Sequence, residues 1–273
     1  MVNPESVCRS PWKYDVDPFQ IADNLYYVGN KSVSVHLFDT GDGLLLLDTG
    51  YPQTAYLLLE SIRKAGFDPQ NIRWILHTHA HIDHFGATRM LQEKFGCKTY
   101  MPAADLLFLN EKAEFNWCAE LDIPYTPPYD TWFSVDHAIK DGETFTFGNI
   151  TVTAHSAAGH TPGTMAFVFQ LPGGLRAAMH GGIGWNTLTS AYSEQFHIGN
   201  TWREDYIASM DRIKDLEVDI VLGNHPNQSK TFQKQAAKTE DNNPFIDKDA
   251  WRNLIISTRN AAMEMFEKDP IET

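Results

Sequence analysis

The sequence predicts an α/β protein that forms one domain. Two sets of strand-like apolar runs, each bounded by Gly-, Pro- or Asn-containing turns, are separated by segments with helical spacing of apolar residues. The 273 residues suit one large domain or two small ones, and 42% hydrophobic against 21% charged residues is typical of a globular protein with ample core. Because the chemically distinctive stretches spread over most of the chain, we expect residues 1–273 to form a single domain.

The first half of the chain predicts alternating strands and helices. Pro52 suits the first turn of one helix and Gly66 its end. Residues 1–17 contain scattered prolines and are expected to form an irregular N-terminal arm. Strands are expected at 24–29, 33–39, 44–48, 72–76 and 98–101, and helices at 53–65, 87–95 and 103–120.

The second half predicts further strands, followed by helices. Residues 124–129 contain three prolines and are expected to form a loop, and residues 181–201 a long one. Residues 234–248 are polar and are expected to be a loose connection. Strands are expected at 131–135, 143–147, 150–155, 165–171, 175–179 and 218–222, and helices at 202–216 and 249–267, the second being a C-terminal helix.

The most distinctive stretch lies between the strand at 72–76 and the helix at 87–95. Eight residues carry four histidines and one carboxylate: His77, His79, His81, Asp83 and His84. Neutral imidazoles and carboxylates are the ligands of zinc and iron. On an extended segment His79 and His81 point the same way, and the turn into a helix can move Asp83 and His84 toward a second position. The spacing therefore predicts a metal site, with one metal ion near each pair.

This stretch resembles the His-x-His-x-Asp-His signature of the metallo-β-lactamase superfamily. Asp48-Thr49-Gly50 resembles the family's strand-ending motif, the segment around His160 its third-histidine motif, and His225 in Gly-Asn-His-Pro its last ligand. The resemblance covers about residues 18–230. It implies an αβ/βα four-layer sandwich with the metal ions at one edge, and the second set of strands fits the internal pseudo-symmetry of that fold.

The resemblance also implies two ligand sets and a reaction class. His79, His81 and His160 would hold one metal ion, and Asp83, His84 and His225 the other. Three protein ligands per ion leave room for water, as in catalytic zinc sites. The expected protein is a hydrolase with two Zn²⁺ per chain and a metal-bound hydroxide as nucleophile, in which Asp83 also orients the hydroxide or passes a proton.

One departure from the family pattern bears on the substrate. Most members carry an aspartate that bridges both metal ions after the strand at 175–179, whereas this chain has Gly181 and Gly182 there. With that carboxylate missing, the sequence is most similar to the third β-lactamase subclass, which uses a His-His-His and an Asp-His-His set. The glycines are expected to leave space for a substrate ring or for His180, which we count with Asp83 as a candidate catalytic residue. Trp117, Tyr192 and Phe196 are candidates for a substrate wall.

Four functions fit these features. The leading hypothesis is hydrolysis of a cyclic amide, as in β-lactamases, and the missing bridging aspartate favours it. Hydrolysis of a lactone, ester or thioester on the same fold is the alternative. An iron-dependent oxidoreductase is a third possibility: His81 argues against the diiron members, which have Glu there, but the mono-iron persulfide enzymes keep the first two histidines and only metal analysis excludes them. A binding protein with a vestigial site is the fourth, and the complete ligand set disfavours it.

Composition narrows the partners and the compartment. A formal net charge of −13 disfavours nucleic acid, whose phosphates would be repelled, so we expect a small-molecule substrate. No apolar run is long enough to cross a membrane and no signal peptide is recognisable, which predicts a cytoplasmic protein, or a periplasmic or secreted one if a leader was trimmed. Cys8, Cys97 and Cys118 show no disulfide or metal spacing and are expected to be free thiols. The oligomeric state has no sequence signal.

Overall fold

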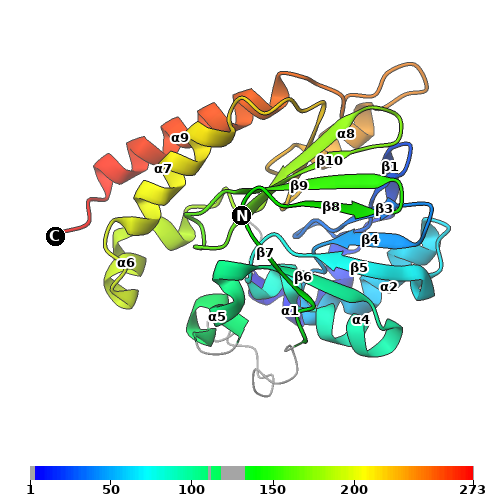
Figure 1. Ribbon diagram of the computed structural model, residues 1–273, viewed down its shortest axis with the longest axis horizontal. Helices are drawn as coiled ribbons and strands as arrows, with labels where there is room; N and C mark the ends of the chain where they lie inside the picture. Colours follow the sequence, from blue (N-terminus) through cyan, green and yellow to red (C-terminus); the bar gives the residue numbers. More distant parts are fainter. Residues whose placement is uncertain (1–3, 110–111, 118–132, 273) are drawn as a thin grey trace.

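The computed structural model describes residues 4–109, 112–117 and 133–272. Two β-sheets lie face to face in the middle of the molecule, and helices cover the outer face of each sheet (Figure 1). This is the predicted αβ/βα sandwich. No helix in the described ranges is long and apolar enough to cross a membrane.

The first sheet has the strands in chain order, β1 to β7. The first three pairings, from β1 to β4, are antiparallel, and those from β4 to β7 are parallel. The strands are β1 (Phe19–Ala22), β2 (Leu25–Tyr27), β3 (His36–Asp39), β4 (Leu44–Leu47), β5 (Ile72–Leu76), β6 (Lys98–Pro102) and β7 (His137–Ile139).

The second sheet has the order β12-β11-β10-β9-β8. Its strands pair antiparallel except β11 with β12, which are parallel. They are β8 (Thr144–Phe147), β9 (Ile150–Ser156), β10 (Met165–Gln170), β11 (Arg176–His180) and β12 (Ile220–Gly223).

Nine α-helices are described, several of them only a turn or two long. The helices α2 and α4 lie on one side of the sandwich, and α7 and α9 on the other (Figure 1). The helices are α1 (Pro4–Arg9), α2 (Ala55–Lys64), α3 (Ile82–Phe85), α4 (Thr88–Phe95), α5 (Leu106–Leu109), α6 (Ser190–Phe196), α7 (Thr201–Ile213), α8 (Thr231–Ala237) and α9 (Ala250–Lys268).

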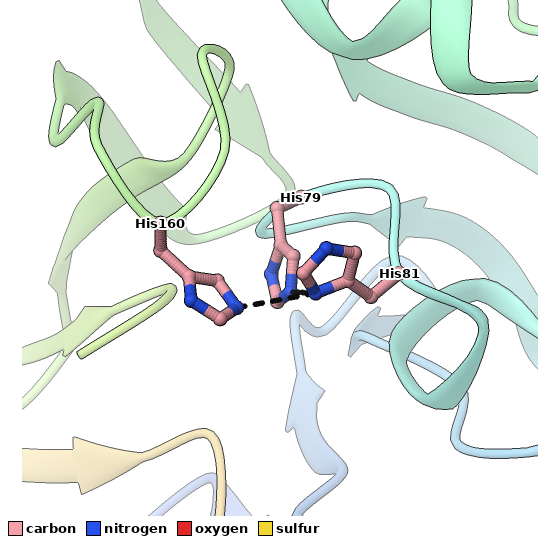
Figure 2. Close-up of side chains that lie close together, drawn as sticks. All are labelled: His79, His81 and His160. Atoms are coloured by element: carbon pink, nitrogen blue, oxygen red, sulfur yellow. Dashed lines mark hydrogen bonds between the residues drawn. The ribbon is translucent and has the colours of Figure 1, made fainter. Parts of the chain in front are cut away.

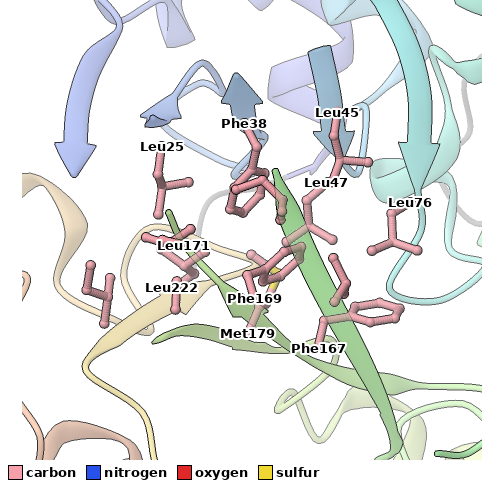
Figure 3. Close-up of a cluster of buried hydrophobic side chains, with 14 of the residues drawn as sticks. Leu25, Phe38, Leu45, Leu47, Leu76, Phe167, Phe169, Leu171, Met179 and Leu222 are labelled. Carbon is pink, nitrogen blue, oxygen red and sulfur yellow. The ribbon is translucent and has the colours of Figure 1, made fainter. Parts of the chain in front are cut away.

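The main core lies between the two sheets. Because side chains alternate along a strand, β4 sends Leu45 and Leu47 inward, while Leu44 and Leu46 pack under α2 and α4. From the second sheet, Phe167 and Phe169 of β10 meet them, and Phe38 stacks on Phe169 with ring centroids 4.4 Å apart (Figure 3). Each sheet is thus apolar on both faces, which explains the nearly continuous apolar runs in its central strands.

The direction of the strands decides where loops with functional side chains meet. β4, β5 and β6 are parallel, so their carboxyl ends lie at one edge of the first sheet. In the second sheet β9, β11 and β12 run in one common direction, because β10 is antiparallel to both β9 and β11. The loops after these six strands carry the residues that the sequence singles out. These loops meet at one edge of the sandwich, where a functional site is expected.

Several sequence predictions differ from the structure at the ends and in the long connections. The N-terminal arm is not wholly irregular, because α1 and a 3₁₀ turn at Pro11–Tyr14 bury Val7 and Cys8. The single helix expected at 103–120 is wrong: 3₁₀ turns at Ala103–Asp105 and Ala113–Asn116 flank the short α5. Residues 118–132, with Cys118 and the proline-rich loop, lie outside the described residues, and 133–135 form no strand.

Two expected loops contain helices. The stretch 181–201 includes α6, whose N-terminus is capped when the Thr189 hydroxyl accepts a hydrogen bond from the backbone N–H of Tyr192 at 3.2 Å. The connection 234–248 begins inside α8. In contrast, the C-terminal helix predicted at 249–267 is present as α9. Cys8 and Cys97 are buried free thiols, as predicted.

Candidate metal centre

Three histidines converge from two different sheets. His79 and His81 lie on the loop after β5, and His160 on the loop between β9 and β10 (Figure 2). Nδ1 of His81 lies 3.0 Å from Nε2 of His79 and 3.1 Å from Nε2 of His160. The three residues are buried, and one ring nitrogen of each lies within 4.8 Å of the others.

Two of these rings are fixed by acceptors on their outer nitrogens. Nδ1 of His160 donates to the carbonyl of Gly184 at 3.0 Å. Nδ1 of His79 donates to the hydroxyl of Thr78 at 3.0 Å, since that hydroxyl uses its own proton on Asp48. The Nε2 atoms that face His81 therefore carry lone pairs, and such an arrangement of lone pairs suits a cation between them.

A second group forms on the side of His84. Nε2 of His84 lies 3.3 Å from a carboxylate oxygen of Asp83, and Nε2 of His225 lies 3.5 Å from the same oxygen. Nδ1 of His225 donates to the carbonyl of Ser32 at 2.8 Å, so its Nε2 also faces the group with a lone pair. The side chains of His225 and Asp83 are 32% and 16% exposed, so this group opens to solvent more than the first.

Asp48 connects the two groups through its carboxylate. One oxygen accepts the backbone N–H of Thr78 at 2.8 Å, and the other accepts the hydroxyl of Thr78 at 2.9 Å and Nδ1–H of His84 at 2.8 Å. Asp48 is fully buried and has φ of +62°, a conformation that Asp tolerates better than most residues. Its strand-ending motif was recognised in the sequence, but its role in orienting His84 and His79 follows only from these contacts.

The electrostatics of the two groups differ. Burial lowers the pKa of His79, His81 and His160, the last to about 4, so all three rings are neutral near pH 7. Burial also opposes a charge on His84, but Asp83 and Asp48 on either side raise its pKa to about 10. Burial by itself would raise the pKa of the Asp83 carboxyl. The neighbouring His84 and His225 have the opposite and larger effect, so the pKa of Asp83 is lowered.

The donor sets fit divalent metal ions. The first set offers three neutral imidazole nitrogens, Nε2 of His79, Nδ1 of His81 and Nε2 of His160, which lie close enough together to bind one cation. The second set offers two imidazoles and a carboxylate, and a metal ion in it would replace the proton of His84. Thus all six residues predicted as ligands, His79, His81, His160, Asp83, His84 and His225, fall into the two predicted groups.

His180 lies apart from both groups. Its ring points to the side of the second sheet that α7 covers, 6.4 Å from the ring of Tyr206, and its Nδ1 accepts the backbone N–H of Gly182 at 3.1 Å. It belongs to neither candidate group among the described residues, and its catalytic role stays a prediction without a ligand contact to support it.

The expectation that Gly181 and Gly182 leave open space is wrong. A Cβ on Gly181 would lie 2.6 Å from Cβ of Thr78, and a Cβ on Gly182 would lie 2.5 Å from Cδ2 of His160. The end of β11 is therefore packed directly against the loops that carry the first histidine group. Glycine is needed here for close approach of the backbone, not to create a cavity.

Asp105 is a part of the site that sequence analysis missed. It follows β6, is fully buried, and its carboxylate accepts hydrogen bonds from the backbone N–H of Ala80, the hydroxyl of Thr161 and the backbone N–H of Gly163. Burial raises its pKa to about 6, against the opposing effect of these hydrogen bonds. The available signal was positional: Asp105 stands after a parallel strand next to β5, where functional residues gather.

Aromatic side chains line the His81 side of the centre. The ring of Trp117 lies 5.7 Å from that of His81, and Tyr192 stacks on Trp117 at 6.3 Å. Phe196 lies behind Tyr192 at 4.6 Å. Of the three predicted wall residues, Trp117 is the one whose ring contacts a candidate ligand, His81. His77 is packed between the carbonyl of Tyr100 and the hydroxyl of Thr88 and is not a ligand in either group.

A family comparison covers more than half of the chain. The profile of the metallo-β-lactamase superfamily matches residues 28–178, which include β3 to β10 and five of the six candidate ligands, all except His225. The chain belongs to the metallo-β-lactamase superfamily.

Solved structures of metallo-β-lactamases superpose over nearly the whole chain. BJP-1, a subclass B3 metallo-β-lactamase of Bradyrhizobium japonicum, is 28% identical with a TM-score of 0.82, and the match covers 96% of this chain and 98% of that one. FEZ-1 of Legionella gormanii is 27% identical with a TM-score of 0.81, covering 93% and 97%. Similarity to the third β-lactamase subclass, predicted from the ligand pattern, is thus confirmed.

Curated relatives match over a shorter region. A hydroxyacylglutathione hydrolase of Rhizobium johnstonii is 31% identical over 152 residues, which is 56% of this chain and 48% of that protein. Ribonuclease TTHA0252 of Thermus thermophilus is 31% identical over 157 residues, 55% of this chain and 35% of that protein. The matched region therefore spans between a third and a half of the length of these relatives.

Proposed function

We propose that this protein is a metal-dependent hydrolase with two zinc ions per chain that opens a cyclic amide of the β-lactam class. The observation that carries the proposal is the pair of three-residue groups, in which neutral imidazole nitrogens and one carboxylate converge from loops of both sheets. Superposition on subclass B3 enzymes along almost the entire chain supports the same conclusion.

The nature of the donors supports zinc. Three imidazoles, or two imidazoles and a carboxylate, with positions left for water are typical of catalytic zinc sites. Zinc ions bound by these residues would supply Lewis acidity, which polarises a carbonyl group and makes water a nucleophile near neutral pH.

The protein's own residues would orient the reactants. Asp83 presents a carboxylate next to His84 and His225 on the more exposed side of the centre, where it could accept a proton from water or pass one to a leaving nitrogen. Trp117 places a flat apolar surface beside His81, against which an apolar part of a substrate could pack while water is excluded.

The absence of a shared carboxylate favours a cyclic amide. Among the described residues the two groups contain a single carboxylate, that of Asp83, which belongs to one group only. The bridging aspartate found in lactonases and thioesterases of this superfamily has no counterpart at Gly181 or Gly182, and the packing there would not admit one.

Hydrolysis of a thioester, ester or lactone is the second candidate. It is favoured by the hydroxyacylglutathione hydrolase of Rhizobium johnstonii, which is 31% identical over 152 residues. A ribonuclease is matched as well, but the formal net charge of −13 continues to argue for a small-molecule substrate rather than RNA.

The test is metal analysis of the purified full chain, followed by a substrate screen. The metal content is measured by mass spectrometry, and the zinc-loaded protein is assayed with a β-lactam, a lactone and a glutathione thioester. We expect about two zinc ions per chain and β-lactam opening. His81→Ala serves as the inactive control, because the loss of one ligand removes metal and activity from the first group together.

The outcomes separate the candidates. Thioester or lactone turnover without β-lactam opening would move the assignment to the second candidate. One iron ion and no zinc would contradict the hydrolase assignment, and full turnover in His81→Ala would show that the site is misassigned.

A further inference from the structure

Asp105 lies between the two loops that supply the first histidine group. One of its carboxylate oxygens accepts the backbone N–H of Ala80 at 2.9 Å, and Ala80 stands between His79 and His81. The same oxygen accepts the hydroxyl of Thr161 at 2.7 Å, and Thr161 follows His160 directly. The other oxygen accepts the backbone N–H of Gly163 at 2.7 Å. One buried carboxylate thus holds both loops.

These contacts cross the interface between the two sheets. Ala80 belongs to the loop after β5 of the first sheet, whereas Thr161 and Gly163 belong to the β9–β10 loop of the second. Asp105 itself stands on a 3₁₀ turn at the end of β6, the parallel neighbour of β5. A connection of this kind fixes the distance between His160 and the His79–His81 pair independently of any bound ion.

We propose that Asp105 is a positioning residue that holds the first histidine group in its metal-binding geometry before a metal ion arrives. This inference rests on the proposed function, because it assumes that the group binds metal. It assigns to Asp105 no contact with metal or substrate. Its effect passes through Ala80 and Thr161, the chain neighbours of all three histidines.

The chemistry of the contacts requires a carboxylate. All three partners are donors, and an ionised carboxylate offers only acceptors, so every contact is satisfied. An asparagine would turn an NH₂ toward a backbone N–H and leave buried donors unpaired. The fit is also close in space, since a Cβ on Gly163 would lie 2.5 Å from Cγ of Asp105.

The experiment isolates the first group and measures its zinc affinity. In a His225→Ala background, which removes a ligand of the second group, Zn²⁺ affinity is measured by competition with a chromophoric chelator, and the Co²⁺ absorption spectrum reports the coordination geometry. Asp105→Asn is compared with Asp219→Asn. The Asp219 carboxylate likewise accepts a backbone N–H, that of Arg176 at 2.8 Å, but at the opposite ends of β11 and β12 from the site.

A second pair of variants, with smaller changes, tests the inference even if Asp105→Asn does not fold. Thr161 is fully buried. Thr161→Val removes the hydroxyl that donates to Asp105, whereas Thr161→Ser retains a hydroxyl there. Far-UV circular dichroism and the melting temperature of the metal-free proteins show whether each variant is folded.

The expected result is a zinc affinity of the first group weakened about 10- to 100-fold in Asp105→Asn, with an altered Co²⁺ spectrum. Asp219→Asn should keep the parent affinity and spectrum even where its melting temperature falls, and Thr161→Val should bind more weakly than Thr161→Ser. Equal affinities within each pair would overturn the inference, and the threonine pair decides alone if Asp105→Asn does not fold. If the His225→Ala parent itself binds no zinc, the proposed function fails, which is a different outcome.

Discussion

At the scale of single residues, the site depends on which ring nitrogen of each histidine donates a hydrogen bond to the surrounding protein and which one faces the group. Carbonyl, hydroxyl or carboxylate oxygens accept the outer Nδ1–H of His79, His84, His160 and His225. His81 has the opposite orientation, with Nδ1 facing the group. The candidate ligands can be read from the sequence, whereas the nitrogen that each presents depends on hydrogen-bond acceptors elsewhere in the fold.

A histidine outside the two candidate metal groups makes the fold sensitive to acid. His36 on β3 is 1% exposed, its Nδ1 has no hydrogen-bond partner, and burial lowers its pKa to about 3. A group with a depressed pKa in the folded state contributes stability above its ordinary pKa of about 6.5, and this contribution is lost as pH falls toward 3. At pH 5 this single histidine should cost about 2 kcal/mol of unfolding free energy.

We expect His36→Phe to remove this sensitivity, because phenylalanine cannot take up a proton and can pack on Tyr27 as the imidazole does. The measurement is chemical denaturation of both proteins at pH 8 and pH 5. The comparison at pH 8 gives the cost of repacking alone, and an equal loss of stability in both proteins between the two pH values would contradict the prediction.

At the scale of elements, the site is built at the ends of strands by loops packed more tightly than their glycines suggest. The end of β11 runs against the histidine loops, and Gly182 faces the ring of His160. The carbonyl of Gly184, two residues further on, accepts the hydrogen bond from that ring. A five-residue strand and its following turn thus fix the position of a ligand that belongs to another loop.

Gly182→Ala should therefore displace His160 and weaken the zinc affinity of the first group about 10-fold. Its Cβ would lie 2.5 Å from Cδ2 of His160, which is closer than carbon atoms approach without a shift. Gly184→Ala is the matched control, because its Cβ would lie 3.5 Å from Cε1 of the same ring and 3.1 Å from Oδ1 of Asn186. Both glycines have φ values open to alanine, so the methyl group is the only difference. Equal zinc titrations for the two variants would count against the packing argument.

At the scale of the whole molecule, each candidate metal group joins the two halves of the sandwich. The first group takes His160 from the second sheet, and the second group takes His225 from the loop after β12. Metal binding should then stabilise the fold, because only the folded chain brings these ligands together. The two groups differ in access, since His79, His81 and His160 are buried while the side chain of His225 is 32% exposed.

We expect dilute chelator to remove the two metal ions in sequence, the ion of the Asp83 group first, with activity falling at that first loss. No carboxylate is shared between the groups to hold the second ion more strongly, and its ligands are the more exposed. Metal content, activity and melting temperature are followed together during the titration. Release of both ions in one step would contradict this order and would move the assignment toward lactone or thioester hydrolysis.

The sequence alone determined the α/β class, most central elements and the six candidate ligands. Strand β5 was predicted to the residue, and the ends of α2, α7 and α9 to within three residues, because apolar periodicity and terminal Pro or Gly signals are local properties. The ligands were predictable because four histidines and a carboxylate within eight residues have a chemical meaning whatever their surroundings.

Only the tertiary structure decided what surrounds those ligands. Asp48 and Asp105 act on loops that are distant in sequence, Gly181 and Gly182 prove to be packed rather than open, and His180 points toward α7 instead of the metal groups. The predicted helix over 103–120 failed for a related reason, since its apolar residues pack into the aromatic cluster near His81 from short turns. Each of these outcomes depends on contacts between segments that only the completed sandwich brings together, and no local pattern of residues encodes such contacts.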